Sequence, residues 1–542
     1  MPTIKSRNKP ANWANWKASA CPGPPSTLRP GACWHCPHLT FSNWPAPTSL
    51  KTATAPLTCR GRRKNMTDLC PTPKRSSFLR AARSVLVISL SLNAAAHAVE
   101  PVSAGLKTLE TLDDSDIANR PLKIHAWSTH EGTGVLFIET REIPVVDLSV
   151  RFSAGSSRDD DMPGRAALTL KLLHQGIEGK DAQTIADTFD QLGAQLTSSV
   201  DKDEVRVNLR TLSEPQIRSA AVELFTQLVS APAFSPTATE RIKATALNEL
   251  TLARQNPALL TQQALHAQLY AGHPYASAQA GNEQSIAKLG AEHLRAFHQQ
   301  AYSASNALLV MVGDLSLDDA TTLSIALSQA LPQGPKLAPI ALSTGMATRP
   351  GHAHVEALSG QTHIMLAQPG IPANHPDYVA LQVASLLFGG SGHNRLINEL
   401  RHKRGLTYSA ASFMPLWQAG GPWTISVQTD PDHQEATIGL VKTLFEQWLD
   451  EGPTEQELVD VKRRLAGNLP LTSASNAQML QQLLLIGAHG LPRNFDALVM
   501  QAQQLTPAHI KAVINRYLKA DQWVITSHGP TTTQRPLPVP AP

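Results

Sequence analysis

An internal repeat is the feature of this sequence that most restricts its fold. Landmark residues recur in the same order with nearly constant spacing. The pairs are Gly193 and Gly405 (212 residues apart), Pro236 and Pro453 (217), His293 and His509 (216), and Gly313 and Gly529 (216). Several matches in order at one offset are typical of a duplicated structural unit. We therefore expect two homologous domains of about 215 residues each.

The secondary structure predicted for both halves is mixed, because period-two patterns indicate strands and 3.6-residue patterns indicate helices. In the first half we expect strands at 145–153, 195–199, 204–211 and 308–312, and helices at 163–174, 183–192, 216–228 and 236–254. In the second half we expect strands at 362–367, 424–429 and 523–526, and helices at 378–388, 394–404, 506–518 and one that begins after Thr454. The predicted fold class is α+β, with two homologous domains that each form a mixed β-sheet covered by helices on one face.

Changes in composition place the predicted domain boundaries. The first domain is expected at 119–330 and the second at 352–530. The Pro-, Gly- and Ala-rich stretch 331–351 between them is typical of a linker. The Pro-rich tail 531–542 is expected to be disordered.

The N-terminal region has the pattern of an export signal. From Met66, a basic stretch is followed by the apolar run 85–92 and by a small-x-small site that ends at Ala98, as in a secretory signal peptide. We expect 66–98 to be that signal, cleaved after Ala98, and the alternative is an uncleaved anchor. Residues 1–65 are interpreted as a disordered segment upstream of a start codon that is assigned too early. The mature protein is then expected to be periplasmic or secreted, with no membrane span after cleavage.

Charge and cysteine content argue against two classes of protein. Residues 1–98 hold 14 basic side chains and one acidic one, whereas 99–542 hold 33 basic and 42 acidic side chains. Because the basic excess lies in the leader, we expect no nucleic-acid partner. All five cysteines lie in the first 70 residues, so a disulfide-stabilised mature domain is not expected. Cys33 and Cys36 have the spacing of half a zinc knuckle, but no second half follows nearby.

Several short motifs give the chain a family resemblance. They are Gly155-Ser156, Pro163-Gly164, His273-Pro274-Tyr275, Asn306-Ala307 and Gly313-Asp314 in the first half, and Gly389-Gly390, Arg395-Leu396 and Lys403-Arg404-Gly405-Leu406-x-Tyr408 in the second. Together they resemble the pitrilysin/insulinase family of zinc metallopeptidases, over nearly all of 120–530. The string from Lys403 to Tyr408 is the most specific of these motifs.

The resemblance implies a zinc site that this chain has lost. In the family, an inverted H-x-x-E-H on the first helix supplies two histidine ligands and a general base, and a later glutamate completes the site. Here Ala167, Leu170 and Lys171 stand at the first histidine, the base and the second histidine. Glu249 matches the later glutamate, and no two of the 20 histidines are four residues apart. One carboxylate does not hold zinc tightly, since such sites need three protein ligands, so we expect no cofactor in this chain.

The sequence allows two interpretations for each of two features of this degenerate site. His174, near the end of the same helix, is either a stray ligand or a helix-end histidine. Lys171 and Glu249 are expected to form an ion pair in which the ammonium replaces the charge of the lost metal, with two separate surface charges as the alternative. Breaking one side of such a pair would cost about 3–5 kcal/mol if it were buried.

A second set of family residues is retained. The resemblance implies that Arg404 and Tyr408 reach over a zinc site and bind the substrate backbone and the oxyanion. This is chemically reasonable, because an arginine offers several donors to a carbonyl and a tetrahedral intermediate needs a donor where its charge develops. We expect both residues to face a concave surface. The alternative is that Arg404 is a helix C-terminal charge and Tyr408 a packed strand residue.

This combination resembles one chain of a split peptidase. We expect a non-catalytic subunit of a periplasmic heterodimeric zinc metallopeptidase, which supplies Arg404 and Tyr408 to a homologous partner for peptide hydrolysis. That partner would carry an intact H-x-x-E-H motif and the zinc, and the substrates would be peptides. The alternatives are a stand-alone peptide-binding or structural pseudopeptidase, and a self-sufficient protease with an unrecognised metal site.

Overall fold

The computed structural model describes residues 122–343, 349–390, 392 and 394–540. The predicted signal peptide, its cleavage site and the segment upstream of it lie outside the described residues, as does part of the predicted linker. The described residues all belong to one compact unit. None of their helices is long and apolar enough to cross a membrane.

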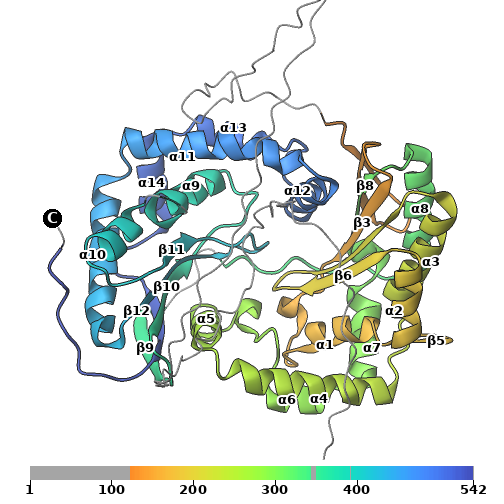
Figure 1. The fold of residues 1–542 in the computed structure, drawn as a ribbon, viewed down its shortest axis with the longest axis horizontal. Coiled ribbons are helices and arrows are strands. Elements are labelled where there is room, and N and C mark those ends of the chain that lie inside the picture. The colour runs from red at the N-terminus through yellow and green to blue at the C-terminus, as the bar shows by residue number, and fades with distance from the viewer. Residues whose placement is uncertain (1–121, 344–348, 391, 393, 541–542) are drawn as a thin grey trace, which may run out of the picture. The chain divides into compact units, whose positions relative to one another are not determined.

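The first half forms a six-stranded mixed sheet with the order β1-β2-β8-β3-β7-β6, in which only β2 and β8 are parallel neighbours (Figure 1). Its strands are β1 (His125–Ser128), β2 (Gly134–Glu139), β3 (Val145–Phe152), β6 (Gln195–Val200), β7 (Val205–Leu212) and β8 (Ala307–Gly313). A separate short hairpin contains β4 (Gly176–Ile177) and β5 (Lys180–Asp181). The helices are α1 (Arg165–Leu173), α2 (Ala182–Gln191), α3 (Pro215–Ser230), α4 (Pro236–Ala253), α5 (Pro257–Leu269), α6 (Glu283–Lys288), α7 (Ala291–Ala301) and α8 (Leu317–Ala330).

The second half forms a five-stranded mixed sheet with the order β11-β12-β10-β13-β9, in which only β13 and β9 are parallel neighbours. Its strands are β9 (Gly351–Glu356), β10 (Thr362–Pro369), β11 (Ala410–Phe413), β12 (Pro422–Thr429) and β13 (Val524–Gly529). The helices are α9 (Tyr378–Gly389), α10 (Gln434–Glu451), α11 (Glu455–Asn468), α12 (Asn476–His489), α13 (Ala497–Gln503) and α14 (Pro507–Tyr517). A π-helix, η5, spans Ile397–His402.

The strand orders confirm the predicted duplication. Read from β9, the second sheet runs β9-β13-β10-β12-β11, which reproduces β2-β8-β3-β7-β6 with the parallel pair in the same place. The landmark glycines also correspond. Gly193 and Gly405 have φ values of 62° and 61°, and Gly313 and Gly529 end the equivalent strands β8 and β13.

Alternating side chains divide the central strands between two apolar layers, as the two-residue period of a strand requires. In β2, Val135 and Phe137 belong to the core shared with the helices of the first half. Leu136 and Ile138, the intervening residues, belong to a different cluster on the opposite face. Each sheet therefore has two faces to cover, and its own helices cover one of them.

The opposite face of each sheet is covered by a helix from the other half. Helix α12 of the second half packs on β8, β3 and β2 through buried residues such as Leu480, Leu483 and Leu484. Helix α5 of the first half packs on β13 and β10 of the second sheet. Figure 1 shows this exchange, with α12 drawn beside β8 and α5 beside β9 and β10. The expectation of helices on one face of each sheet was therefore incomplete, because the helix that closes the second face comes from the other repeat.

A buried polar contact also joins the halves, and it involves one of the family motifs. The Tyr275 hydroxyl donates to Asp203 Oδ1 at 2.7 Å, and the backbone N–H of Ala419 donates to that hydroxyl at 2.9 Å. The backbone N–H of Gln418 donates to Asp203 Oδ2 at 2.6 Å. Tyr275 therefore links the tip of the β6–β7 hairpin to a loop of the second half.

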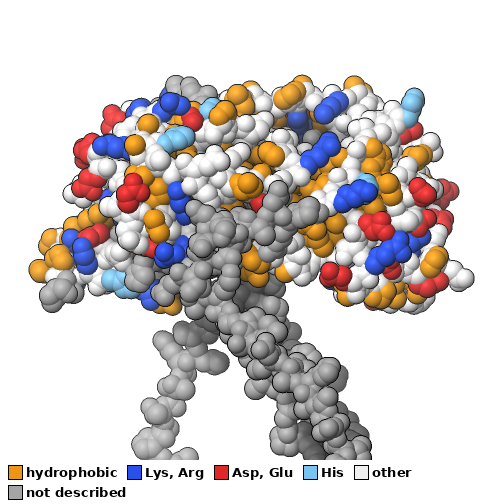
Figure 2. Space-filling model, turned by 90° about the horizontal axis from the view of Figure 1, so that it is seen from above, with side chains coloured by type: hydrophobic (Ala, Val, Ile, Leu, Met, Phe, Trp, Pro, Cys, Tyr) orange, Lys and Arg blue, Asp and Glu red, His pale blue; other side chains and the backbone are white. Residues whose placement is uncertain are grey.

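Charged side chains on the described surface are not sorted by sign on the face shown in Figure 2. Acidic, basic and apolar side chains are interspersed there. This agrees with the nearly balanced charge of the sequence beyond the leader.

Candidate functional site

Helix α1 carries the positions of the lost metal motif, and a buried carboxylate holds its start. Asp159 accepts hydrogen bonds from the backbone N–H groups of Gly164 and Ala166, both at 2.8 Å. Burial raises the pKa of Asp159 to about 7. Gly164 has a φ of 92°, and a Cβ there would lie 2.9 Å from the Cα of Gly281. Glycine is required for this close approach, which fixes the direction in which α1 leaves the turn.

Two of the three positions that the motif would use on α1 carry apolar side chains. Ala167 is half-buried, and Leu170 is only 5% exposed and belongs to the core beneath the first sheet. Neither side chain has a lone pair with which to bind a metal. The position of the general base has thus become part of the hydrophobic core.

The third position, Lys171, forms the predicted ion pair. Its Nζ contacts Oε2 of Glu249, which lies on α4, and α4 packs against α1. The pair is confirmed, but it is not buried, because the two side chains are 34% and 57% exposed. An ion pair this exposed contributes only about 0–1 kcal/mol, so the cost that applies to a buried pair does not apply here.

His174 is a helix-end residue rather than a stray ligand. It is the C-cap of α1, and its Nε2 lies 2.9 Å from the Ser198 hydroxyl on β6. Burial lowers the pKa of its imidazole. Over the part of the chain that the structure describes, no three histidine, cysteine or acidic side chains gather in a group that could hold a metal ion. The zinc that the family resemblance implies therefore does not fit the residues present on α1 and α4.

Arg404 and Tyr408 follow a helix that differs from the predicted one. A regular helix was expected at 394–404, but the segment is a π-helix from Ile397 to His402, followed by a turn. The Lys403 N–H donates to the Asn398 carbonyl at 3.0 Å, five residues back, and this wide turn is the reason for the difference. Gly405 then takes a φ of 61° and redirects the chain toward β11.

The two retained side chains have different surroundings. Arg404 is 15% exposed, and its Nη1 donates to the Glu399 carboxylate at 2.5 Å. Tyr408 is 78% exposed, and the Arg401 guanidinium lies 4.4 Å from the centre of its ring. The alternative of a packed strand residue is therefore wrong for Tyr408. That both residues face a concave surface stays a prediction.

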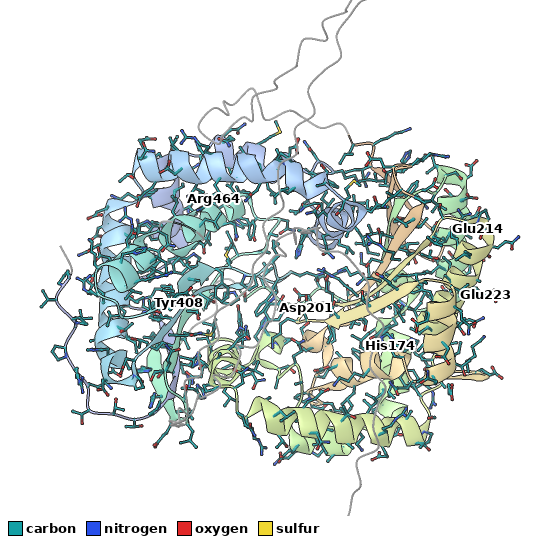
Figure 3. All side chains as sticks on the ribbon, in the orientation of Figure 1. His174, Asp201, Glu214, Glu223, Tyr408 and Arg464 are labelled. Carbon is teal, nitrogen blue, oxygen red and sulfur yellow. The ribbon has the colours of Figure 1, made fainter. Side chains whose placement is uncertain are left out.

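The sequence reasoning missed the neighbours Glu399 and Arg401. Glu399 lies in the π-helix and Arg404 in the turn that follows it, so two side chains five residues apart meet, whereas a regular α-helix pairs residues three or four apart. No hydrogen bond or ion pair of the described residues joins Arg404 or Tyr408 to Lys171 or Glu249. Figure 3 shows Tyr408 in the second half, well separated in that view from His174 of the first half. The structure does not bring the retained pair and the degenerate metal site together within this chain.

Comparison with known proteins relates both halves to peptidases. The family described as "Insulinase (Peptidase family M16)" matches residues 135–283, and "Peptidase M16 inactive domain" matches residues 288–465. A crystal structure of a peptidase M16 inactive domain from Pseudomonas fluorescens is 41% identical, with a TM-score of 0.73, and covers 77% of this chain and 100% of that one.

Two further matches, both from Helicobacter pylori, have lower identity to this chain. One, named Non-peptidase homolog YmxG, is 24% identical over 392 residues, which are 71% of this chain and 88% of that protein. The other is a protease of known crystal structure with 19% identity and a TM-score of 0.70, covering 75% of this chain and all of that one. The second likeness is one of fold alone.

Proposed function

This chain belongs to the insulinase family of peptidases, peptidase family M16, and from that premise we propose that it is the non-catalytic subunit of a heterodimeric zinc peptidase. A homologous partner with an intact H-x-x-E-H motif would bind the zinc and cleave peptides. This chain would contribute Arg404 and Tyr408 to that active site. The observation that carries the proposal is the combination of a metal-site helix without ligands and an exposed Tyr408 in the family's second motif.

The degenerate site supports the non-catalytic part of the proposal. A cation at that site would meet the Lys171 ammonium, which already contacts the one carboxylate that could serve as a ligand. The general base of the family is replaced by buried Leu170, which has no group to take a proton. Restoring one residue would leave the other two unsuited to a metal.

The second motif supports the proposal that this chain contributes residues to the active site of a partner. The exposed hydroxyl of Tyr408 is free of hydrogen bonds to other described residues, so it is available as a donor to an oxyanion. Arg404 is partly engaged by Glu399, but a guanidinium has five N–H donors and keeps others for a peptide carbonyl. The Arg401 guanidinium against the Tyr408 ring would hold that ring in place.

A second candidate is a stand-alone pseudopeptidase that binds peptides or has a structural role. The ion pair between Arg404 and Glu399 favours it, because it gives Arg404 a partner without a second chain. The name of the Helicobacter pylori non-peptidase homologue is also compatible with it. The two candidates differ in whether a zinc-binding homologue must be present.

Reconstitution tests the leading proposal. The chain is mixed with the M16 homologue of its host that has an intact zinc motif, and peptide hydrolysis is measured for each chain and for the mixture. We expect turnover only in the mixture. Turnover by the homologue alone at the same rate would support the stand-alone candidate instead.

Tyr408→Phe then tests the role of the retained pair. Loss of a donor to the oxyanion reduces kcat by about 10²–10³-fold in other enzymes, and we expect a loss of that order in the mixture without loss of complex formation. Tyr517→Phe is the matched control, since its hydroxyl donates to Asp377 at 2.8 Å, away from the motif. Equal turnover by the two variants would mean that Tyr408 has no catalytic contribution.

The predicted export signal supports a periplasmic location. Fusing residues 66–98 to a reporter that is active only outside the cytoplasm tests this part separately. Reporter activity is expected, and it should be lost when the apolar run 85–92 is deleted.

A further inference from the structure

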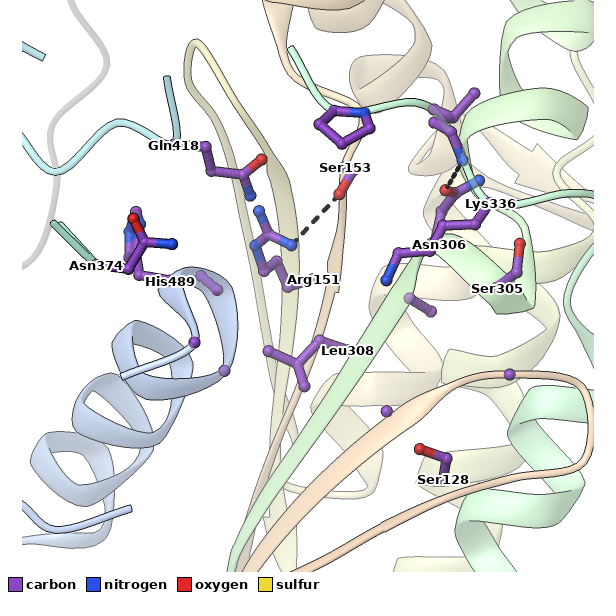
Figure 4. Close-up of a pocket in the computed structure, with 18 of the residues that line it drawn as sticks. Ser128, Arg151, Ser153, Ser305, Asn306, Leu308, Lys336, Asn374, Gln418 and His489 are labelled. Atoms are coloured by element: carbon purple, nitrogen blue, oxygen red, sulfur yellow. Dashed lines mark hydrogen bonds between the residues drawn. The ribbon is translucent and has the colours of Figure 1, made fainter. Parts of the chain in front are cut away.

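A cavity of about 610 Å³ lies where the two halves meet, and neither the degenerate metal site nor Arg404 and Tyr408 line it. The first sheet, the segment that follows α8, and the C-terminal end of α12 all contribute to its wall (Figure 4). Cavities of this size hold small organic ligands in many proteins. The chemistry of the wall therefore indicates what the cavity would accept.

The charged side chains of the wall are all basic. Arg151, Arg158 and Lys336 line the cavity, and among its described lining residues there is no aspartate or glutamate. Behind the wall, the Glu204 carboxylate contacts both Arg151 and Arg206, and Asp203 interacts electrostatically with both Arg151 and Arg158. These two carboxyl groups are fewer than the four basic side chains Arg151, Arg158, Arg206 and Lys336. The site keeps a positive excess that favours an anion.

Arg151 has an unused donor although it is almost fully buried. It is 5% exposed, and its Nη2 is buried without a hydrogen-bond partner. Its Nη1 makes only a long hydrogen bond to the Ser153 hydroxyl, at 3.4 Å. Figure 4 shows this guanidinium beside Gln418 and Ser153. A buried N–H group without an acceptor is costly, and a ligand oxygen would satisfy it.

Arg158 is only half-buried, but it also has an unused donor. Its Nη2 donates to the Ala338 carbonyl at 2.7 Å, whereas its Nε is buried without a partner. Burial lowers the pKa of this guanidinium, although Asp203 and Asp160 act in the opposite direction. The charge of Arg158 is therefore incompletely compensated by the protein, and an anion in the cavity would stabilise it.

The uncharged part of the wall suits an organic molecule. Gln418, Asn374 and His489 add polar groups, and burial lowers the pKa of His489 to about 4, so the imidazole is neutral near pH 7. Leu308 and Leu337 supply apolar surface. A phosphate ion would fill only a small part of 610 Å³, whereas a carboxylate on a larger body would reach the arginines and cover the apolar wall as well.

We propose that this cavity is a binding site for an organic carboxylate of the size of a short peptide. The carboxylate would lie between Arg151 and Arg158, with Lys336 at the exposed side of the site. Arginine binds carboxylates through two parallel hydrogen bonds, which a point charge does not provide. This inference is independent of the proposed peptidase partnership, because it concerns the isolated chain.

Calorimetry with three probes tests the class of ligand. The purified chain is titrated with an acetylated tri-alanine peptide that has a free C-terminal carboxylate, with the same peptide as a C-terminal amide, and with inorganic phosphate. We expect the free acid to bind one site per chain. The amide should bind at least about tenfold more weakly, as expected for the loss of a charged hydrogen bond. Equal binding of acid and amide, no binding of the acid at millimolar concentration, or tighter binding of phosphate would overturn the proposal.

Two substitutions locate the site. Arg158→Gln should weaken binding of the free acid about tenfold, and Arg295→Gln is its control, because Arg295 also donates to backbone carbonyls but does not line the cavity. Lys336→Glu places a negative charge at an exposed position and should weaken binding about threefold or more without affecting the fold. Its control is Lys442→Glu, at an exposed position on α10. If Lys336→Glu and Lys442→Glu bind the acid equally, the ligand is not in this cavity.

Discussion

The two sheets receive their exchanged helices through different contacts. Helix α12 meets the first sheet with a continuous apolar surface, and Gly487 brings it so close that a Cβ there would lie 2.5 Å from Leu308 Cδ2. Helix α5 meets the second sheet partly through hydrogen bonds. The Thr261 hydroxyl lies 3.1 Å from Nδ1 of His528, and Thr526 donates to the Thr261 carbonyl at 3.0 Å. The exchange is thus common to both repeats, but close apolar packing holds one helix and buried polar pairing helps to hold the other.

The two halves also differ at their functional positions. In the first half, the helix that would carry the zinc ligands keeps its place in the fold while its polar residues are replaced. In the second half, the motif keeps Arg404 and Tyr408, which follow a π-helix. Packing therefore preserves the architecture of both repeats, whereas only the first repeat has lost the functional residues of the family motif.

Removing apolar contact under α12 should have the largest effect on stability. Leu483 is fully buried between α12 and the first sheet. Leu483→Ala should lower the free energy of unfolding by about 2–5 kcal/mol, as for other buried leucines. Urea denaturation followed by circular dichroism measures the change. Val459→Ala, at a 40% exposed position on α11, is the control and should change the stability by less than about 0.5 kcal/mol. Equal effects would mean that the exchange of α12 adds little to the fold.

Removing the polar contact under α5 should have a smaller effect. Thr261→Val keeps the shape of the side chain but leaves Nδ1 of His528 without its partner. A loss of about 1–3 kcal/mol in the free energy of unfolding is expected for one unpaired buried polar group. Thr251→Val is a matched control. Both hydroxyls donate to the carbonyl four residues earlier, Thr261 at 2.7 Å and Thr251 at 3.0 Å, but Thr251 is exposed. A neutral effect of Thr261→Val would show that apolar packing is enough to hold α5 on the second sheet.

Breaking the ion pair at the degenerate metal site should have the smallest effect. Because Lys171 and Glu249 are 34% and 57% exposed, Lys171→Met should change the free energy of unfolding by about 0–1 kcal/mol. A double-mutant cycle with Glu249→Gln measures the coupling between the two side chains. A coupling of about 3 kcal/mol or more would indicate a pair that behaves as if it were buried.

These contrasts also show what the sequence could and could not predict. The repeat was visible because Gly193 and Gly405 occupy positions with positive φ that other residues rarely adopt. The pairing of Lys171 with Glu249 followed from the family resemblance. The exposure of the pair did not, since it depends on how α4 packs against α1. The exchange of α5 and α12 was missed, because an apolar helix face does not reveal which sheet will cover it. The contact of Glu399 with Arg404 was missed because the expected regular helix is replaced by a π-helix that ends at His402, and Arg404 lies in the turn after it.

Restoring one ligand at a time would sharpen the comparison between the halves at their functional positions. Ala167→His adds an imidazole to α1, but Leu170 and Lys171 still lack the groups for a base and a second ligand. We expect this variant to bind zinc no better than the unchanged chain, because a structural or catalytic zinc site needs three protein ligands. Tight zinc binding by Ala167→His would show that two further ligands are already in place.

Zinc content of the purified chain tests the central claim most directly. After dialysis against metal-free buffer, elemental analysis should find far less than one zinc ion per chain, and peptide hydrolysis by this chain alone should be absent. The isolated zinc-motif homologue is the positive control for zinc content, and its mixture with this chain is the positive control for peptide hydrolysis. About one zinc ion per chain, retained after dialysis, would contradict the account, because it would mean that the first half has kept a metal site in spite of Ala167, Leu170 and Lys171.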